Sequence, residues 1–168
     1  MCPTFDQNAE ITHEGGCACG HVRYRMEAAP LFVHCCHCRH CQRETGASFA
    51  LNALIESDRV RILAGEPEAT PTPSNSGRGQ DIWRCPRCRV ALWSNYAGFG
   101  DKVSFIRVGT LDEPDRITPG IHIFTESKQP WVVIPDEHPS VERYYDLKQY
   151  WPDSSRERLR QLRSGSGS

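Results

Sequence analysis

The 168-residue sequence lacks long apolar runs and has almost no net charge. No stretch approaches the ~20 apolar residues that a membrane-spanning helix requires, and the beginning of the chain lacks the basic start and apolar run of a secretory signal. We therefore expect no membrane partner and a cytoplasmic location. Lysine and arginine total 20 against 21 acidic residues, a formal charge of -1, so the chain has no general attraction for phosphate backbones. The composition disfavours a nucleic-acid partner.

Cysteine, by contrast, is abundant. There are nine cysteines, an odd number that argues against a complete disulfide framework. In a reducing compartment, clustered thiolates are better explained as metal ligands than as disulfides. They fall into three groups and one isolated residue near the chain start, which we expect to be a frayed terminal thiol: Cys17 and Cys19; Cys35, Cys36, Cys38 and Cys41; Cys85 and Cys88; Cys2.

Short segments of alternating apolar and polar residues predict a mainly β fold. A period of two is typical of half-buried strands, and brief apolar runs between Gly, Pro and Asp fit short strands equally well. The 38% hydrophobic content suits one domain with its own core. The alternating segments are 21–26, 58–63, 102–108 and 121–124, and the apolar runs are 31–33, 49–55, 90–93 and 131–134.

The chain divides into an N-terminal extension (1–14), a main domain (15–150), a C-terminal helix (151–163) and a terminal Ser-Gly linker (164–168). Within the main domain, 64–80 is rich in Pro, Gly, Ser and Thr and is expected to be an exposed loop. Asp153 and Ser154 are predicted to cap a helix from Ser155 to about Leu162. Its arginines are predicted to form a solvated face: Arg156, Arg158, Arg160 and Arg163.

Two cysteine motifs far apart in the sequence can supply four ligands together. Cys17-Ala18-Cys19 places two sulfur atoms on one side of an extended segment, and Cys85-Pro86-Arg87-Cys88 forms a tight knuckle. Four thiolates define a closed, structural zinc site. Such a site would join the start of the domain to its middle, although a disulfide or free thiols remain alternatives.

A third motif offers three thiolates from one short turn, Cys36, Cys38 and Cys41. Catalytic zinc sites commonly have three protein ligands and leave one position to water or substrate. Spacing alone does not decide whether this site is open, because four neighbouring side chains could close it: His34, Cys35, His37 and His40. Cys35 is expected to face away from Cys36 on an extended segment and to act as a small buried hydrophobe.

These motifs together closely resemble the glutathione-dependent formaldehyde-activating enzyme (GFA) family, which also includes centromere protein V-like proteins. One departure follows Cys88, where the family usually continues with Gly-Thr and this chain has Arg89-Val90. The resemblance spans roughly Gly15 to Pro135. Its main segments are Gly15–Tyr24, Cys36–Phe49 and Trp83–Cys88, with softer matches at Gly109–Asp112, His122–Phe124 and Pro130–Trp131.

The resemblance implies a β-tent fold similar to Mss4-like proteins, with two zinc ions. One ion would be structural, at Cys17, Cys19, Cys85 and Cys88. The other would be labile and face the substrate thiol, at Cys36, Cys38 and Cys41. The implied activity is that of a carbon–sulfur lyase or thiol-adduct synthase, which acts on glutathione or a similar thiol and a small aldehyde.

Several further residues are candidates for roles in that reaction. His122, His37 and His40 could exchange a proton with the aldehyde oxygen, and Arg43 could bind a glutathione carboxylate. An apolar pocket could be lined by Trp83, Phe124 and Trp131. The rival interpretations are a non-enzymatic zinc module that binds protein or nucleic acid, and a redox sensor that releases zinc on oxidation. The fourth ligand of the second zinc distinguishes these interpretations, because Cys35 or a histidine in that position would make catalysis doubtful and favour the binding module.

Overall fold

The computed structural model describes residues 11–164. Three predicted features therefore lie wholly or largely outside the described residues: the terminal thiol Cys2, most of the N-terminal extension, and the linker after Ser164. Within the described range, no helix is both long and apolar enough to cross a membrane.

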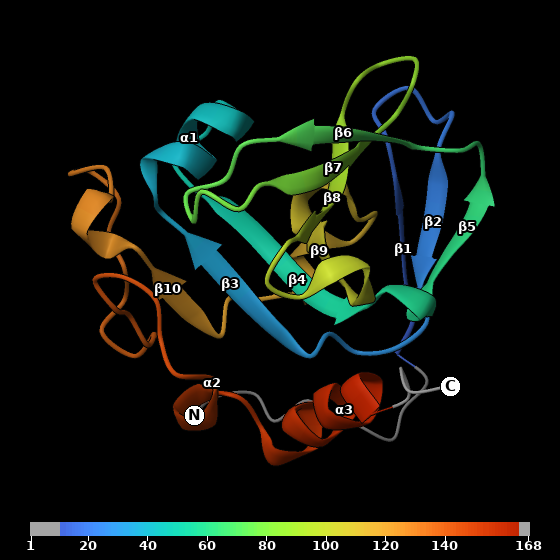
Figure 1. Ribbon diagram of the computed structural model, residues 1–168. Coiled ribbons are helices and arrows are strands. Elements are labelled where there is room, and N and C mark those ends of the chain that lie inside the picture. The colour runs from blue at the N-terminus through green and yellow to red at the C-terminus, as the bar shows by residue number, and fades with distance from the viewer. Residues whose placement is uncertain (1–10, 165–168) are drawn as a thin grey trace.

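Residues 11–164 form ten strands in two sheets (Figure 1), which confirms the predicted mainly β class. The small antiparallel sheet has the order β1-β2-β5, and the large sheet has the order β10-β3-β4-β9-β8-β7-β6. In the large sheet only β10 and β3 pair in parallel. The strands are β1 His13–Gly16, β2 Arg23–Met26, β3 Phe32–Cys36, β4 Ala50–Glu56, β5 Val60–Ala64, β6 Glu68–Thr72, β7 Gln80–Arg84, β8 Ala91–Tyr96, β9 Val103–Arg107 and β10 Ile121–Ile123.

The helices are few and short. Single 3-10 turns occur at 57–59, 100–102, 108–110, 114–116 and 125–127. The predicted C-terminal helix is present, but it begins at Asp153, two residues earlier than expected, because Arg156 N already donates to the Pro152 carbonyl at 3.0 Å. The α-helices are α1 Arg39–Thr45, α2 Leu147–Tyr150 and α3 Asp153–Ser164.

The predicted loop 64–80 is wrong in its secondary structure, although much of it is exposed as expected. Residues 68–72 form the edge strand β6, which pairs with β7. Its residues are largely exposed, so no apolar alternation marks it. Pro71 is tolerated because an edge strand leaves one side of its backbone unpaired. The apolar run 131–134 is not a strand: Trp131 and Val133 are 70% and 86% exposed, and prolines flank the run.

The large sheet has an apolar cluster on each face. Toward the small sheet lie Tyr24 of β2, Trp93 of β8 and Ile106 of β9. The opposite cluster joins Leu54 of β4 to the C-terminal segment, through residues that include Trp151 and Leu159. Because side chains alternate along a strand, adjacent residues of β3 belong to different faces. This division separates Cys35 from Cys36.

Candidate functional site

The first cysteine cluster connects the two sheets. Cys17 and Cys19 lie in the β1–β2 connection, and Cys85 and Cys88 lie between β7 and β8. The sulfur atoms are free thiols within 4.8 Å of one another, with 3.5 Å between Cys17 and Cys19 and 3.8 Å between Cys19 and Cys85. Four thiolates at ~2.3 Å around a tetrahedral zinc are about 3.8 Å apart. The cluster therefore fits a four-thiolate metal site.

Backbone groups around this cluster favour thiolate. Val22 N donates to Cys17 Sγ at 3.2 Å, and the N–H of Val90 lowers the pKa of Cys88 to about 6. Arg89 adopts φ 63°, the left-handed conformation in which the family's usual glycine would be unstrained. Its N–H donates to the Cys85 carbonyl at 3.0 Å, so the knuckle closes despite the departure from the family pattern.

The second cluster is built where β3 passes into α1. Cys36 ends β3, Cys38 is the N-cap of α1, and Cys41 lies in its first turn. Cys41 N donates to Cys38 Sγ at 3.3 Å, and the three sulfur atoms lie within 4.8 Å of one another. Hydrogen bonds with the thiols of Cys36 and Cys41 lower the pKa of Cys38. Hydrogen bonds within the same three thiols raise the pKa of Cys36. The hydrogen bonds among the three thiols thus favour the thiolate form of Cys38 over that of Cys36.

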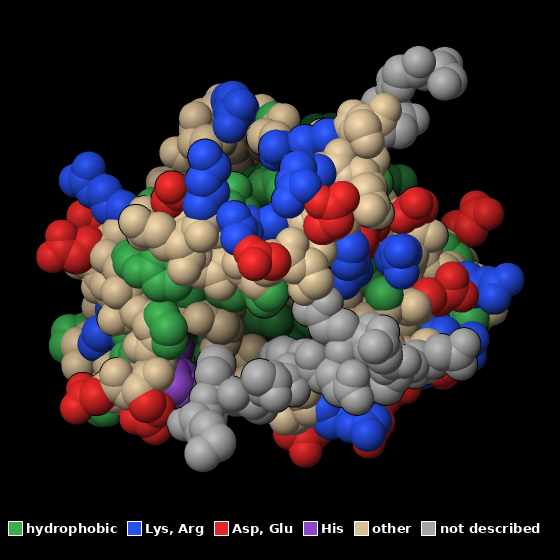
Figure 2. All heavy atoms as spheres, turned by 90° about the horizontal axis from the view of Figure 1, so that it is seen from below, with side chains coloured by type: hydrophobic (Ala, Val, Ile, Leu, Met, Phe, Trp, Pro, Cys, Tyr) green, Lys and Arg blue, Asp and Glu red, His purple; other side chains and the backbone are tan. Residues whose placement is uncertain are grey.

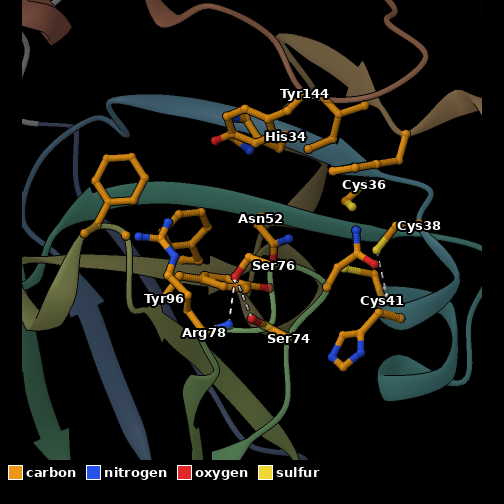
Figure 3. Close-up of a pocket in the computed structure, with 17 residues that line it drawn as sticks. His34, Cys36, Cys38, Cys41, Asn52, Ser74, Ser76, Arg78, Tyr96 and Tyr144 are labelled. Carbon is orange, nitrogen blue, oxygen red and sulfur yellow. Dashed lines mark hydrogen bonds between the residues drawn. The ribbon is translucent and has the colours of Figure 1, made fainter.

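The three cysteines open on a pocket of about 360 Å³ (Figure 3). The figure shows His34 and Tyr144 on one side, Ser74, Ser76 and Arg78 on the opposite side, and the cysteines at one end. Within residues 11–164, this three-cysteine group includes no fourth cysteine, histidine or carboxylate ligand. The arrangement can accept a metal ion and leave room for a ligand in the pocket.

The structure places the four residues that could have closed this site elsewhere or gives them other partners. Cys35 is buried and belongs to a different cluster from Cys36, as expected if it faces away, but it lies there beside His37 and not simply as a hydrophobe. His34 Nε2 is hydrogen-bonded to the Tyr145 hydroxyl, and burial lowers its pKa to about 3. His40 lines the pocket and accepts a hydrogen bond from Gln80 Nε2 at 3.3 Å.

His122 is not brought to the pocket, which corrects its expected place beside the substrate. In the parallel pairing of β10 with β3, His122 is in register with Cys35 and Ile123 with Cys36. Ile123 therefore lines the pocket, and His122 lies with His37 in the other cluster. The sequence indicated a strand at 121–124 but not its neighbour, and the neighbour decides which face meets the cysteines.

The predicted apolar lining is partly correct. Phe124 lines the pocket. Trp83 instead packs on Trp93, with ring centroids 6.0 Å apart, and Trp131 is 70% exposed. Aromatic composition alone did not distinguish these three environments.

Arg78, rather than Arg43, is the arginine at the pocket. Arg43 is exposed near the end of α1 and does not line it. Arg78 lies in the β6–β7 connection, where its backbone N–H donates to Ser76 Oγ at 3.4 Å. Among the described residues it makes no ion pair, so its guanidinium is available to an anion. A lone arginine in a Ser/Gly-rich stretch was the only sequence signal for it.

A buried ionic network fixes α1 over the sheet. Glu44 of α1 accepts from Arg84 Nη2 at 2.5 Å and from Arg107 Nη2 at 3.0 Å. Arg107 also donates to Asn52 Oδ1 at 2.6 Å, and Asn52 lines the pocket. The side chains of Glu44 and Arg107 are 8% and 10% exposed. This network joins the helix that carries Cys41 to strands β4, β7 and β9.

Fold and clusters together define a small β protein with two cysteine clusters that could each hold a metal ion, one of them open to a pocket. The model of the glutathione-dependent formaldehyde-activating enzyme family matches residues 12–127, more than half of the chain. The chain belongs to this family. A curated Halomonas elongata protein that carries this name provisionally is 26% identical over 125 residues, which cover 72% of this chain and 80% of that protein.

One solved structure, a crystal structure of a Rhodobacter sphaeroides protein, also matches. It has a TM-score of 0.44 and 18% sequence identity, covering 76% of this chain and 99% of that one.

Proposed function

We propose that this protein catalyses the reversible addition of a thiol such as glutathione to a small aldehyde such as formaldehyde. In the direction of cleavage it is a carbon–sulfur lyase. The observation that carries the proposal is the three-cysteine group, which opens on a pocket and lacks a fourth protein ligand among the described residues. The four-cysteine group has the opposite character, because its ligand set is complete.

Zinc is the metal that these ligands suit best, since all-thiolate tetrahedral sites are typical of it. One ion is assigned to Cys17, Cys19, Cys85 and Cys88, and a second, labile ion to Cys36, Cys38 and Cys41. When bound at the second site, zinc supplies a means of holding a substrate thiol as its thiolate at neutral pH.

The reaction requires few groups from the chain. In synthesis, a carbon–sulfur bond forms as the carbonyl π bond breaks, and the thiol proton ends on the new hydroxyl oxygen. His40, at the pocket and oriented by Gln80, is the proposed carrier of this proton. Partial burial raises the pKa of Tyr144 to about 12, so its phenol stays protonated and can donate a hydrogen bond into the pocket. Neither His37 nor His122 has this access.

Arg78 is the proposed contact for a carboxylate of glutathione, because it borders the pocket and makes no ion pair within residues 11–164. On the face seen in Figure 2, positive and negative side chains lie among one another, which disfavours a phosphate backbone as the partner there. We place the protein in the cytoplasm, since its eight described cysteines are all free thiols.

The test is to incubate zinc-loaded protein with a panel of thiol adducts, S-hydroxymethylglutathione first, and to follow carbon–sulfur cleavage by NMR. Cleavage faster than in buffer is expected, and Cys38→Ser is expected to lose it. Arg78→Ala is expected to raise KM for the glutathione adduct about tenfold, as loss of one charge-assisted contact would. Arg43→Ala, a matched arginine outside the pocket, is expected to leave KM unchanged.

The same experiment can contradict the proposal. If no adduct reacts faster than in buffer, or Cys38→Ser is equally active, the enzyme interpretation fails. A protein side chain as fourth ligand in the zinc-loaded crystal structure would favour a binding module. Zinc release by low peroxide without any turnover would favour a redox sensor.

A further inference from the structure

The geometry points to a third metal site in this protein, formed by Cys35, His37 and His122, that takes a divalent transition-metal ion such as zinc. It is separate from both cysteine clusters described above and does not depend on the proposed reaction. The three ligand atoms lie within 4.8 Å of one another, and all three residues are buried.

The distances between the ligand atoms match those around a tetrahedral ion. Cys35 Sγ lies 3.6 Å from His37 Nε2, and His37 Nε2 lies 3.0 Å from His122 Nδ1. With bonds of ~2.3 Å to sulfur and ~2.05 Å to nitrogen, tetrahedral ligands are about 3.6 Å apart for sulfur and nitrogen and about 3.3 Å for two nitrogens. A small outward movement of the two rings would admit the ion.

The polypeptide directs these three side chains to one point. Cys35 and His37 are two residues apart on an extended segment, so they face the same side. The pairing of β10 with β3 places His122 directly beside Cys35. The rings of His37 and His122 are nearly parallel, at 23°, with centroids 5.3 Å apart. Cys35 and His122 thus come from two paired strands, and His37 lies directly after the end of β3.

The three ligand atoms face one another inside the protein. His37 Nε2 lies between Cys35 Sγ and His122 Nδ1, so one ring nitrogen is shared by both neighbours. The opposite ring nitrogens, His37 Nδ1 and His122 Nε2, are buried and have no hydrogen-bond partner among the described residues, where the two histidines are 0% and 8% exposed. An ion bound at His37 Nε2 and His122 Nδ1 would leave the ring N–H on these opposite nitrogens. His138 lies beside His122, with ring centroids 5.7 Å apart.

One thiolate and two neutral imidazoles form a donor set for zinc, cobalt or copper rather than for magnesium or calcium, which prefer oxygen. Metal binding would displace the Cys35 thiol proton to solvent, because the thiolate is the ligand. The ion would lie on the opposite face of β3 from Cys36 and the pocket. It would fix the segment 35–38 from behind, since Cys36 and Cys38 alternate with its own ligands.

The experiment counts and classifies bound metal in the full chain. Apo-protein is loaded with cadmium-113, desalted, and measured by elemental analysis and cadmium-113 NMR. We expect three ions per chain and three resonances, one from each cluster, with the one-thiolate resonance well separated from the two thiolate-rich ones. Cys35→Ala and His122→Gln should each lose one ion and that resonance alone. His13→Gln, a buried histidine outside every cluster, should retain all three.

Two ions and two thiolate-rich resonances in the wild-type chain would overturn the inference and leave a hydrogen-bonded thiol–imidazole trio. The same conclusion follows if three ions bind but both variants keep them all. Should a variant fail to fold, the wild-type spectrum still decides. The cobalt(II) form gives an independent reading, because one-thiolate and three-thiolate sites differ in sulfur-to-cobalt charge-transfer intensity.

Discussion

Glu44 shows how a single carboxylate can position a cysteine cluster that it does not touch. It lies one turn after Cys41 on α1, and its two oxygens accept hydrogen bonds from Arg84 and Arg107. Because Glu44 and Arg107 are both almost fully buried, each charge depends on the other for compensation. The position of α1, and with it that of Cys41, follows from this pairing.

Replacing Glu44 with Gln is expected to destabilise the zinc-loaded protein by about 3 kcal/mol, because it leaves the buried Arg107 without a countercharge. The measurement is the free energy of unfolding from urea denaturation. Glu68→Gln is the control: its pair with Arg89 is 60% and 66% exposed, and such a pair is worth at most about 0.5 kcal/mol. Equal effects of the two substitutions would contradict the positioning role.

At the scale of single residues, the sequence predicts how the cysteines divide into clusters, but it does not predict which other residues surround each cluster. Ligand spacing is local, so Cys36, Cys38 and Cys41 could be grouped from the sequence alone. The place of His122 depends on the register between β10 and β3, which no local pattern encodes. Arg78 reaches the pocket only because β6 and β7 form a hairpin. To predict that Glu44 is buried, the relative positions of three strands would have to be known.

Among the elements, α3 differs most from its expected character. The predicted solvated face holds for Arg160, whose side chain is 70% exposed, but not for Arg158, at 21%. Arg158 donates to both oxygens of Glu56 on β4, at 2.8 and 2.5 Å, and to the Ala29 carbonyl at 3.0 Å. An arginine-rich helix gives no sequence signal for which member is paired, because all four are equally polar.

Arg158→Ala is expected to detach α3 from β4 and to destabilise the chain by about 3 kcal/mol, since Glu56 is 5% exposed and would keep only the more distant Arg59, at 3.7 Å. Urea denaturation measures the loss, and hydrogen exchange of the α3 amides shows whether the helix has opened. Arg160→Ala on the same helix should change the free energy of unfolding by no more than about 0.5 kcal/mol. A similarly small change for Arg158→Ala would mean that apolar contacts alone hold α3.

Three strands were missed, β1, β6 and β7, and each has few buried apolar side chains. β6 is an exposed edge strand, β1 ends in two glycines, and β7 buries Gln80 beside Ile82. Hydrogen bonds to neighbouring strands define them instead. Strands with an apolar buried face, such as β4 and β9, were predicted to within a few residues. Sequence patterns report apolar burial, and strand pairing without it leaves little trace.

At the scale of the whole molecule, the four-cysteine cluster brings together segments that adjoin the two sheets. Cys17 and Cys19 adjoin the small sheet, and Cys85 and Cys88 adjoin the large one. A zinc ion bound there, as proposed, would contribute directly to folding, because the unfolded chain cannot preserve the arrangement of its ligands. The three-cysteine cluster lies at the β3–α1 junction and does not bridge the two sheets.

Removal of metal by a strong chelator is therefore expected to lower the stability by at least about 5 kcal/mol, or roughly 10–20 °C in Tm for a chain of this size. Thermal unfolding followed by circular dichroism measures this shift. Cys85→Ser should reproduce most of it, whereas Cys38→Ser should retain a Tm close to that of the loaded wild type. The reverse order would mean that the structural role belongs to the three-cysteine cluster.

Because residues 35–38 alternate between two faces of the sheet, an insertion or deletion here would disturb the protein more than a substitution would. Even-numbered residues serve the pocket and odd-numbered ones the opposite face. A single inserted residue ahead of Cys35 would exchange the two sets, so that each face would receive the other's sulfur and imidazole groups. A homologue could thus replace one ligand residue with another here. An insertion or a deletion, however, would require compensating changes on both faces of the sheet.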